Sequence, residues 1–123
     1  MHKLLIVDDE PEILETTKWA FQVAGFEVHT ASNAEEALDL LYSLRPQTLL
    51  IDYKLPNLSG MEVLRAAKEM NPKAVAIMIT GLTHQSEWIK SESDRLGADG
   101  FLQKPLQMER VVKIVNELTQ EEK

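Results

Sequence analysis

The chain has 123 residues, of which 44% are hydrophobic and 27% charged, and 13 Lys and Arg face 20 Asp and Glu for a formal net charge of −7. This length suits one domain with a substantial core, and we expect a single domain over residues 1–123. So acidic a chain, without a stripe of Lys and Arg, is a poor candidate for direct nucleic-acid binding. The absence of cysteine excludes disulfides, thiolate metal sites and cysteine nucleophiles.

The chain also lacks the marks of membrane insertion. Met1, His2 and Lys3 lead into an apolar strand rather than a signal-peptide core. No apolar run approaches the roughly 20 residues that cross a bilayer. We therefore expect a soluble, cytoplasmic protein that does not bind membranes.

In the first half of the chain, apolar runs alternate with segments of helical periodicity. Residues 3–7 (KLLIV) are continuously apolar, as a strand buried on both faces requires. Pro11 is placed in the first turn of a helix that Gly25 ends. Ser32 and Glu35 have the spacing of a capping box for the next helix. The predicted elements are a strand at 3–7, a helix from Pro11 to Gly25, a strand at 26–30 and a helix from Ser32 to about Leu44.

The second half continues the alternation. Pro46 and Pro72 block helical continuation, and Pro105 is placed in the first turn of the last helix. Residues 85–96 are polar and only weakly amphipathic. The predicted elements are a strand at 48–51, a loop at 52–60, a helix from Met61 to Met70, a strand at 74–79, a helix at about 85–96, a short strand around 101–102, a helix from Pro105 through Leu118 and a frayed tail at 120–123.

Five strand–helix units with apolar strands predict an α/β fold, in which helices cover both faces of a parallel sheet. Right-handed crossovers favour a doubly wound arrangement, whose ligands bind beyond the carboxyl ends of the strands. The side chains that follow the strands should therefore lie together at one edge. These are Asp8, Asp9 and Glu10 after the first strand, Asp52 after the third, Thr80 after the fourth and Lys104 after the fifth.

Such a cluster has a definite chemistry. Carboxylates within about 4 Å of one another repel by several kcal/mol at an effective dielectric near 20, and a cation relieves the crowding. Oxygen ligands of this kind suit Mg²⁺, while Lys104 and Thr80 can contact phosphoryl oxygens. These are the parts that phosphoryl transfer to Asp52 needs. Since the sequence contains no Gly-rich phosphate loop, a nucleotide is not the obvious donor.

The motifs together resemble the receiver domain of bacterial two-component response regulators, over essentially the whole chain. The matching segments are 5–10 (LIVDDE), 49–52 (LLID), 55–60 (LPNLSG), Thr80-Gly81 and 97–105 (GADGFLQKP). The resemblance implies a flavodoxin-like (βα)5 fold with strand order 2-1-3-4-5. It also implies a phosphorylation-dependent signalling switch.

The resemblance further implies a role for several residues. Asp52 would be the phospho-acceptor. Asp9, Asp52 and the backbone carbonyl of Lys54 would bind Mg²⁺ or Mn²⁺, with Asp8 acting through a metal-bound water. The phosphoryl donor would be a histidine of a sensor histidine kinase or of a histidine phosphotransfer protein. The domain would catalyse only its own phosphorylation and dephosphorylation.

The remaining implied roles concern the switch. Thr80 and Lys104 would contact the phosphoryl group, and Phe101 would be a rotating aromatic coupled to Thr80. Phe101 lacks the hydroxyl of the tyrosine often found at its position, so its switching would rest on packing. Lys54 and Leu82 lie near positions that tune phosphoryl lifetime in this family, and the segment from Thr80 to Gly97 is longer than usual.

Two alternatives remain. A metal-dependent phosphohydrolase that forms an aspartyl phosphate would need a second acid–base carboxylate shortly after Asp52, and residue 54 is Lys. A receiver-like interaction module that is never phosphorylated would not need the complete set of Asp8, Asp9, Asp52, Thr80 and Lys104. The downstream effector or linked output domain is not specified by the sequence.

Overall fold

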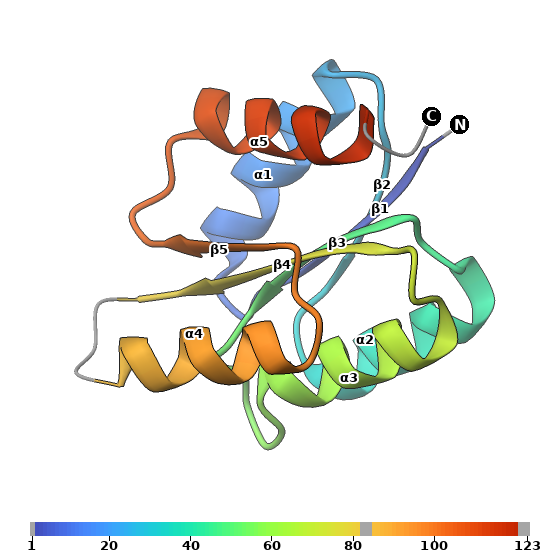
Figure 1. Cartoon of the computed structure of the whole chain (residues 1–123). Helices are drawn as coiled ribbons and strands as arrows, with labels where there is room; N and C mark the ends of the chain where they lie inside the picture. Colours follow the sequence, from blue (N-terminus) through green and yellow to red (C-terminus); the bar gives the residue numbers. More distant parts are fainter. Residues whose placement is uncertain (1, 82–84, 121–123) are drawn as a thin grey trace.

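The computed structural model describes residues 2–81 and 85–120 and places a five-stranded sheet between two layers of helices (Figure 1). Strands and helices alternate along the chain as the hydrophobic pattern predicts. In order they are β1 (Lys3–Val7), α1 (Pro11–Val23), β2 (Glu27–Ala31), α2 (Ala34–Leu44), β3 (Thr48–Asp52), α3 (Gly60–Met70), β4 (Val75–Thr80), α4 (Ser86–Arg95), β5 (Gly100–Gln103) and α5 (Met108–Gln120).

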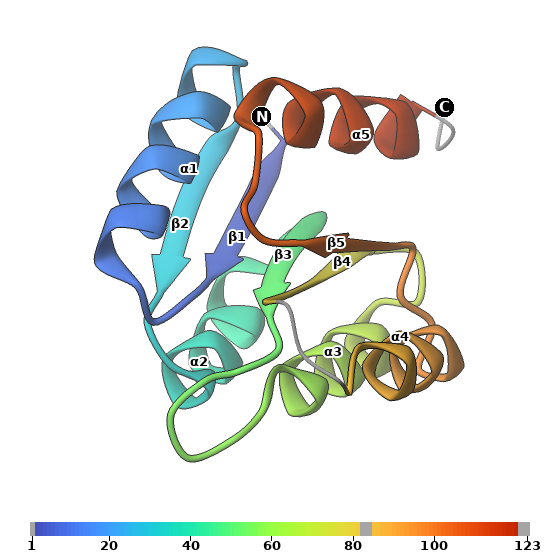
Figure 2. The same cartoon turned by 90° about the vertical axis from the view of Figure 1, so that its left-hand side faces the viewer.

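All strands are parallel, in the order β2-β1-β3-β4-β5, which confirms the predicted fold class. Helices α1 and α5 cover one face, and α2, α3 and α4 cover the other (Figures 1 and 2). The register pairs Val7 with Ile51 and Asp52 with Ile79, so neighbouring strands end at the same edge. Among the described helices, none has the length and apolar character that a membrane span requires.

The three central strands form the core, because helices cover both of their faces. Alternate side chains of a strand point to opposite faces, so each strand contributes to two hydrophobic clusters. In β1, Leu5 and Val7 pack on the side of α2, α3 and α4, whereas Leu4 and Ile6 pack on the side of α1 and α5. This explains why the strands read as continuous apolar runs, and it fixes the strand ends that carry the polar residues.

The predicted capping box of Ser32 and Glu35 was wrong by one residue. The N-cap of α2 is Asn33, whose side chain accepts a 2.8 Å hydrogen bond from the backbone NH of Glu36. The Glu36 carboxylate in turn accepts a 2.8 Å hydrogen bond from the backbone NH of Ser32. The backbone of Asn33 is extended, with φ of −154° and ψ of 168°, so the helix begins at Ala34.

The prediction that Pro105 opens the last helix was also wrong. The β4–β5 pairing continues to Lys104, whose backbone NH donates to the Thr80 carbonyl at 2.8 Å, and the Lys104–Pro105 peptide is cis. Leu106 then packs against the core before the first hydrogen bond of α5, which runs from Val111 NH to the Gln107 carbonyl.

The other predicted elements agree with the structure, with small shifts in their ends. Helix α4 confirms the helix expected at 85–96, and the unusual residues 82–84 lie outside the described part of the chain. Gln120, expected in a frayed tail, is the last residue of α5, whereas 121–123 lie outside the described residues. A single domain over 1–123 stays a prediction.

One buried side chain on α1 is expected to lower the stability of the fold. Thr17 is 1% exposed, and within the described residues its hydroxyl is the buried side-chain group that has no hydrogen-bond partner. Since a buried hydroxyl without a partner carries a desolvation cost, we expect Thr17→Val to raise the free energy of unfolding by about 1 kcal/mol. Urea denaturation measures the change. The matched control is Thr16→Val on the exposed side of the same helix, and an equal effect of both changes would contradict the argument.

Candidate functional site

Acidic side chains gather at the carboxyl edge of the sheet. Asp8 follows β1 and is 2% exposed, and Asp52 ends β3 and is 4% exposed. Asp9 and Glu10 are exposed beside them. Each of these four residues offers a carboxylate oxygen, and the four oxygens all lie within 4.8 Å of one another. The predicted convergence of Asp8, Asp9 and Asp52 is therefore present in the structure.

Lys104 reaches this cluster from the end of β5. Its Nζ lies 3.1 Å from Asp8 Oδ2, 2.8 Å from Glu10 Oε1 and 3.0 Å from Asp52 Oδ2. Burial opposes the charged form of Lys104, but hydrogen bonds to Glu10, Asp52 and Asp8 outweigh it and raise the pKa of the ammonium above its usual value. Lys104 is therefore a permanent cation in the cluster.

The carboxylate of Asp52 is only partly compensated by that cation. Burial and the charge of Asp8 raise the pKa of Asp52 to about 6, although Lys104 and a long 3.4 Å hydrogen bond from the Lys54 backbone NH act in the opposite direction. At neutral pH Asp52 is therefore mostly ionised and able to act as a nucleophile. A further cation in the cluster would stabilise the ionised form of Asp52.

The backbone of Asp52 is held by the loop that follows it. Tyr53 NH donates to the Ile79 carbonyl and Gly60 NH donates to the Tyr53 carbonyl, both at 2.8 Å. Gly60 opens α3 and is so close to Asp52 that a Cβ in its place would overlap the Asp52 carbonyl oxygen. The sequence predicts Gly60 only as the last residue of the loop at 52–60. Its position at the start of a helix that must fold back on β3 is the signal of this close approach.

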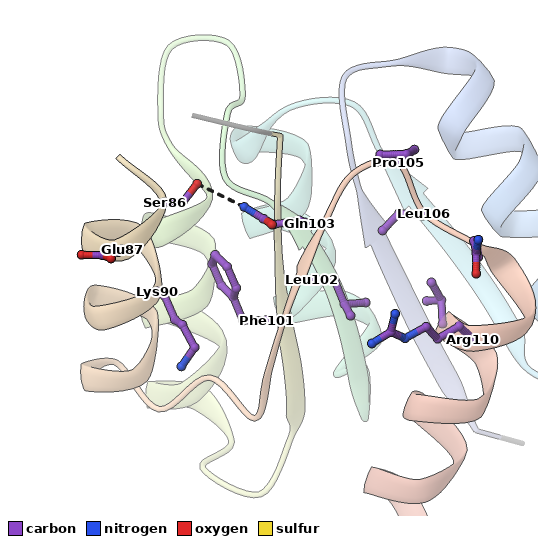
Figure 3. A pocket seen from close by; sticks show the side chains of 11 residues that line it. Ser86, Glu87, Lys90, Phe101, Leu102, Gln103, Pro105, Leu106 and Arg110 are labelled. Carbon is purple, nitrogen blue, oxygen red and sulfur yellow. Dashed lines mark hydrogen bonds between the residues drawn. The ribbon is translucent and has the colours of Figure 1, made fainter. Parts of the chain in front are cut away.

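Thr80 and Phe101 lie on the neighbouring strands β4 and β5. Thr80 is buried at the end of β4, where its hydroxyl donates to the Gly81 carbonyl at 3.3 Å. Phe101 pairs with Met78 in the sheet and is half-buried. Figure 3 shows its ring between β5 and α4, next to Lys90. The structure thus puts an aromatic side chain beside the strand that carries Thr80.

Glu10 is predicted to lie at this edge of the sheet, but the sequence assigns it no role in the site. Glu10 makes the shortest of the three contacts to Lys104. Its place next to Asp8 and Asp9 was visible in the sequence, but the direction of a long side chain at a helix start was not.

Comparison with known proteins identifies this arrangement. A family model described as "Response regulator receiver domain" matches residues 4–116. The chain belongs to this family. A CheY-like receiver domain from Methanospirillum hungatei has a crystal structure that is 32% identical and superposes with a TM-score of 0.88, covering 99% of this chain and 97% of that one.

Two curated response regulators extend the comparison. PhoP of Bacillus subtilis, an alkaline phosphatase synthesis transcriptional regulatory protein, is 33% identical over 84% of this chain and 42% of its own length. MprA of Mycolicibacterium vanbaalenii is 30% identical over 89% of this chain and 47% of its own length. The chain thus spans less than half of either relative. The comparisons confirm the resemblance to receiver domains, the fold class and the signalling function.

Receiver domains generally bind Mg²⁺ in an acidic pocket, and the residues of this receiver fit such an ion. Asp8, Asp9, Glu10 and Asp52 supply hard oxygen ligands at short mutual distances. The raised pKa of Asp52 reflects burial and the charge of Asp8, which together outweigh the stabilisation that Lys104 gives to the ionised carboxylate. A divalent cation would supply the missing positive charge.

Proposed function

We propose that Asp52 is the residue on which this receiver domain accepts a phosphoryl group from a phosphohistidine. The observation that carries the proposal is the contact of Lys104 with both Asp8 and Asp52, which places a fixed cation beside a buried, ionised carboxylate. A carboxylate oxygen of Asp52 would form a bond to phosphorus as the bond from phosphorus to the imidazole nitrogen breaks. The departing imidazole would take a proton from solvent. Lys104 would neutralise charge on the phosphoryl oxygens.

The proposed metal ligands are the carboxylates of Asp9 and Asp52 and the backbone carbonyl of Lys54, with Asp8 acting through a water. Bound Mg²⁺ or Mn²⁺ would supply positive charge opposite the phosphoryl oxygens. The acidic cluster supports this set, since Asp8, Asp9 and Asp52 all contribute to it. A phosphohydrolase is not favoured, because residue 54 is Lys and not the second acid–base carboxylate that it would need. A module that is never phosphorylated is not favoured either, because Asp8, Asp9, Asp52, Thr80 and Lys104 are all present.

The proposed switch runs from Thr80 to the surface beside α4. The Thr80 hydroxyl, which donates to the Gly81 carbonyl, would turn to a phosphoryl oxygen, and Phe101 would repack behind it. Phe101 lines a groove of about 610 Å³ between α4, β5 and α5, together with Lys90 and Arg110 (Figure 3). A downstream partner or linked output domain would bind there, because its shape would change with Phe101.

The proposed partners are a sensor histidine kinase or a histidine phosphotransfer protein, in the cytoplasm. The domain would not bind nucleic acid directly. Its catalysis would be limited to its own phosphorylation and dephosphorylation.

Intact-mass spectrometry after incubation with Mg²⁺ and a small acyl phosphate tests the acceptor. We expect a single phosphoryl adduct on the wild-type protein and none on Asp52→Asn or in the presence of a chelator. Asp39→Asn makes the same chemical change on an exposed part of α2 and should retain the adduct. An adduct that persists in Asp52→Asn would reject Asp52 as the acceptor, and a folded wild-type protein without an adduct would speak against this chemistry.

A further inference from the structure

The three contacts of Lys104 differ in how strongly the fold holds them. The side chains of Asp8 and Asp52 are 3% and 6% exposed, whereas that of Glu10 is 57% exposed. Glu10 nevertheless makes the shortest contact, at 2.8 Å. An ammonium group has three N–H donors. In this structure that of Lys104 donates hydrogen bonds to Glu10 and Asp52 and forms an ion pair with Asp8. A phosphoryl oxygen that binds Lys104 therefore competes with these carboxylates for the ammonium group.

Glu10 is the acceptor that can withdraw at the least cost. Its carboxylate already contacts water, so release from Lys104 does not leave a buried, unpaired charge. The buried carboxylate of Asp8, by contrast, would be left without a neighbouring cation if it withdrew from Lys104. Asp52 becomes the phosphorylated group, and its former negative charge passes to the phosphoryl oxygens.

The Glu10 carboxylate also opposes the product electrostatically. One of its oxygens lies within 4.8 Å of the carboxylate oxygens of Asp8, Asp9 and Asp52. A phosphoryl group on Asp52 adds close to two negative charges beside it. The same side chain therefore competes for Lys104 before phosphorylation and repels the phosphoryl group afterwards.

Glu10 is the N-cap of α1, and it caps the helix through its backbone and not through its carboxylate. Its backbone carbonyl accepts from Leu14 NH at 3.1 Å, its backbone NH donates to Asp8 Oδ1 at 2.9 Å, and its side chain makes no capping hydrogen bond. A change of side chain thus leaves the helix start in place. The carboxylate is directed to Lys104 instead.

We propose that Glu10 is a positioning residue that holds Lys104 in the unphosphorylated protein and slows phosphorylation of Asp52. This inference rests on the proposed acceptor function. Glu10→Gln keeps an oxygen that can accept from Lys104 but removes the charge. Glu12→Gln makes the same change at an exposed position in the first turn of α1 and is the matched control.

The first measurement is the rate of phosphorylation by a small acyl phosphate with Mg²⁺, followed by intact mass. We expect Glu10→Gln to react roughly 3- to 10-fold faster than the wild-type protein, and Glu12→Gln within about 2-fold of it. Because the effect is one of charge, the advantage of Glu10→Gln should shrink as salt concentration rises. A purely structural effect would not depend on salt in this way. A Glu10→Gln rate equal to or below that of the wild type would overturn the inference while leaving Asp52 as the acceptor.

The second measurement is independent of phosphorylation. In metal-free protein, the NMR signal of the Lys104 ammonium should shift in Glu10→Gln and not in Glu12→Gln. An unchanged signal would show that the Glu10–Lys104 contact is absent in solution and would also overturn the inference. A wild-type protein that forms no adduct would instead refute the acceptor function, and the role of Glu10 in it.

Discussion

Without divalent metal at about pH 7.5, the Asp52→Asn variant is expected to be more stable than the wild-type protein by roughly 1–3 kcal/mol. Burial and the charge of Asp8 raise the pKa of Asp52 from 3.8 to about 6 in the folded protein. Ionised Asp52 is therefore less stable in the fold than in the unfolded chain, in spite of Lys104. Asparagine has nearly the shape of the protonated acid and removes this cost.

The pH dependence of this effect follows from the two pKa values. Below about 3.8 the carboxyl is protonated in both states and costs nothing; between 3.8 and about 6 only the unfolded chain releases the proton, and the cost grows. Above a pH of about 6 the carboxyl is ionised in both states, and the cost has its full value. The advantage of Asp52→Asn should therefore be largest at neutral pH and disappear near the acid end of this range.

Urea denaturation of both proteins with a chelator, at a series of pH values, measures the effect. Asp39→Asn on the exposed part of α2 is the control and should change stability little. Added Mg²⁺ should stabilise the wild type more than the variant, since the proposed site would bind it through the carboxylate of Asp52 in the folded protein. A variant less stable than the wild type at neutral pH, or an advantage independent of pH, would contradict the electrostatic account.

Most of the fold could be predicted because its signals are local. The runs at 3–7 and 74–79 are apolar on both faces, which only a covered parallel sheet accommodates. The edge that gathers Asp8 and Asp52 then follows from the direction of the strands. Lys104 could be predicted to lie in the cluster for the same reason, because it too follows a strand.

The errors arose where tertiary packing decides between acceptable local choices. Both Ser32 and Asn33 can cap a helix, and the sequence does not tell which of them has the extended backbone that Asn33 adopts. Pro105 can open a helix, but strand pairing at Lys104 and the packing of Leu106 delay its start.

The missed contact of Glu10 has a similar origin. Sequence order places its Cα at the edge of the sheet but does not say where a flexible side chain ends, and Lys104 is 94 residues away. The roles of Thr80, Phe101 and the Lys54 carbonyl depend on a phosphorylated or metal-bound form. They therefore stay predictions.

Gly60→Ala is expected to lower the free energy of unfolding by at least about 2 kcal/mol. A methyl group at this position would overlap the carbonyl oxygen of Asp52 and lie 2.9 Å from Ile51 Cγ2. Neither neighbour can move easily: the first belongs to the backbone of β3, and Ile51 has no exposed surface. Relief therefore requires α3 and β3 to separate, which breaks close packing in the core. The same shift should slow phosphorylation, because it moves Asp52 relative to Lys104.

Urea denaturation and the acyl phosphate rate assay measure the two effects. Gly81→Ala is the matched control, because no atom of the described residues lies within 4 Å of a methyl group added there and Gly81 has no positive φ. It should change stability by less than about 0.5 kcal/mol. If both variants were equally stable, the loop after Asp52 would yield to the added methyl group, and the backbone of the acceptor would not be fixed by Gly60. If only Gly60→Ala lost stability while its phosphorylation rate stayed normal, the close approach would serve the fold and not the position of the acceptor.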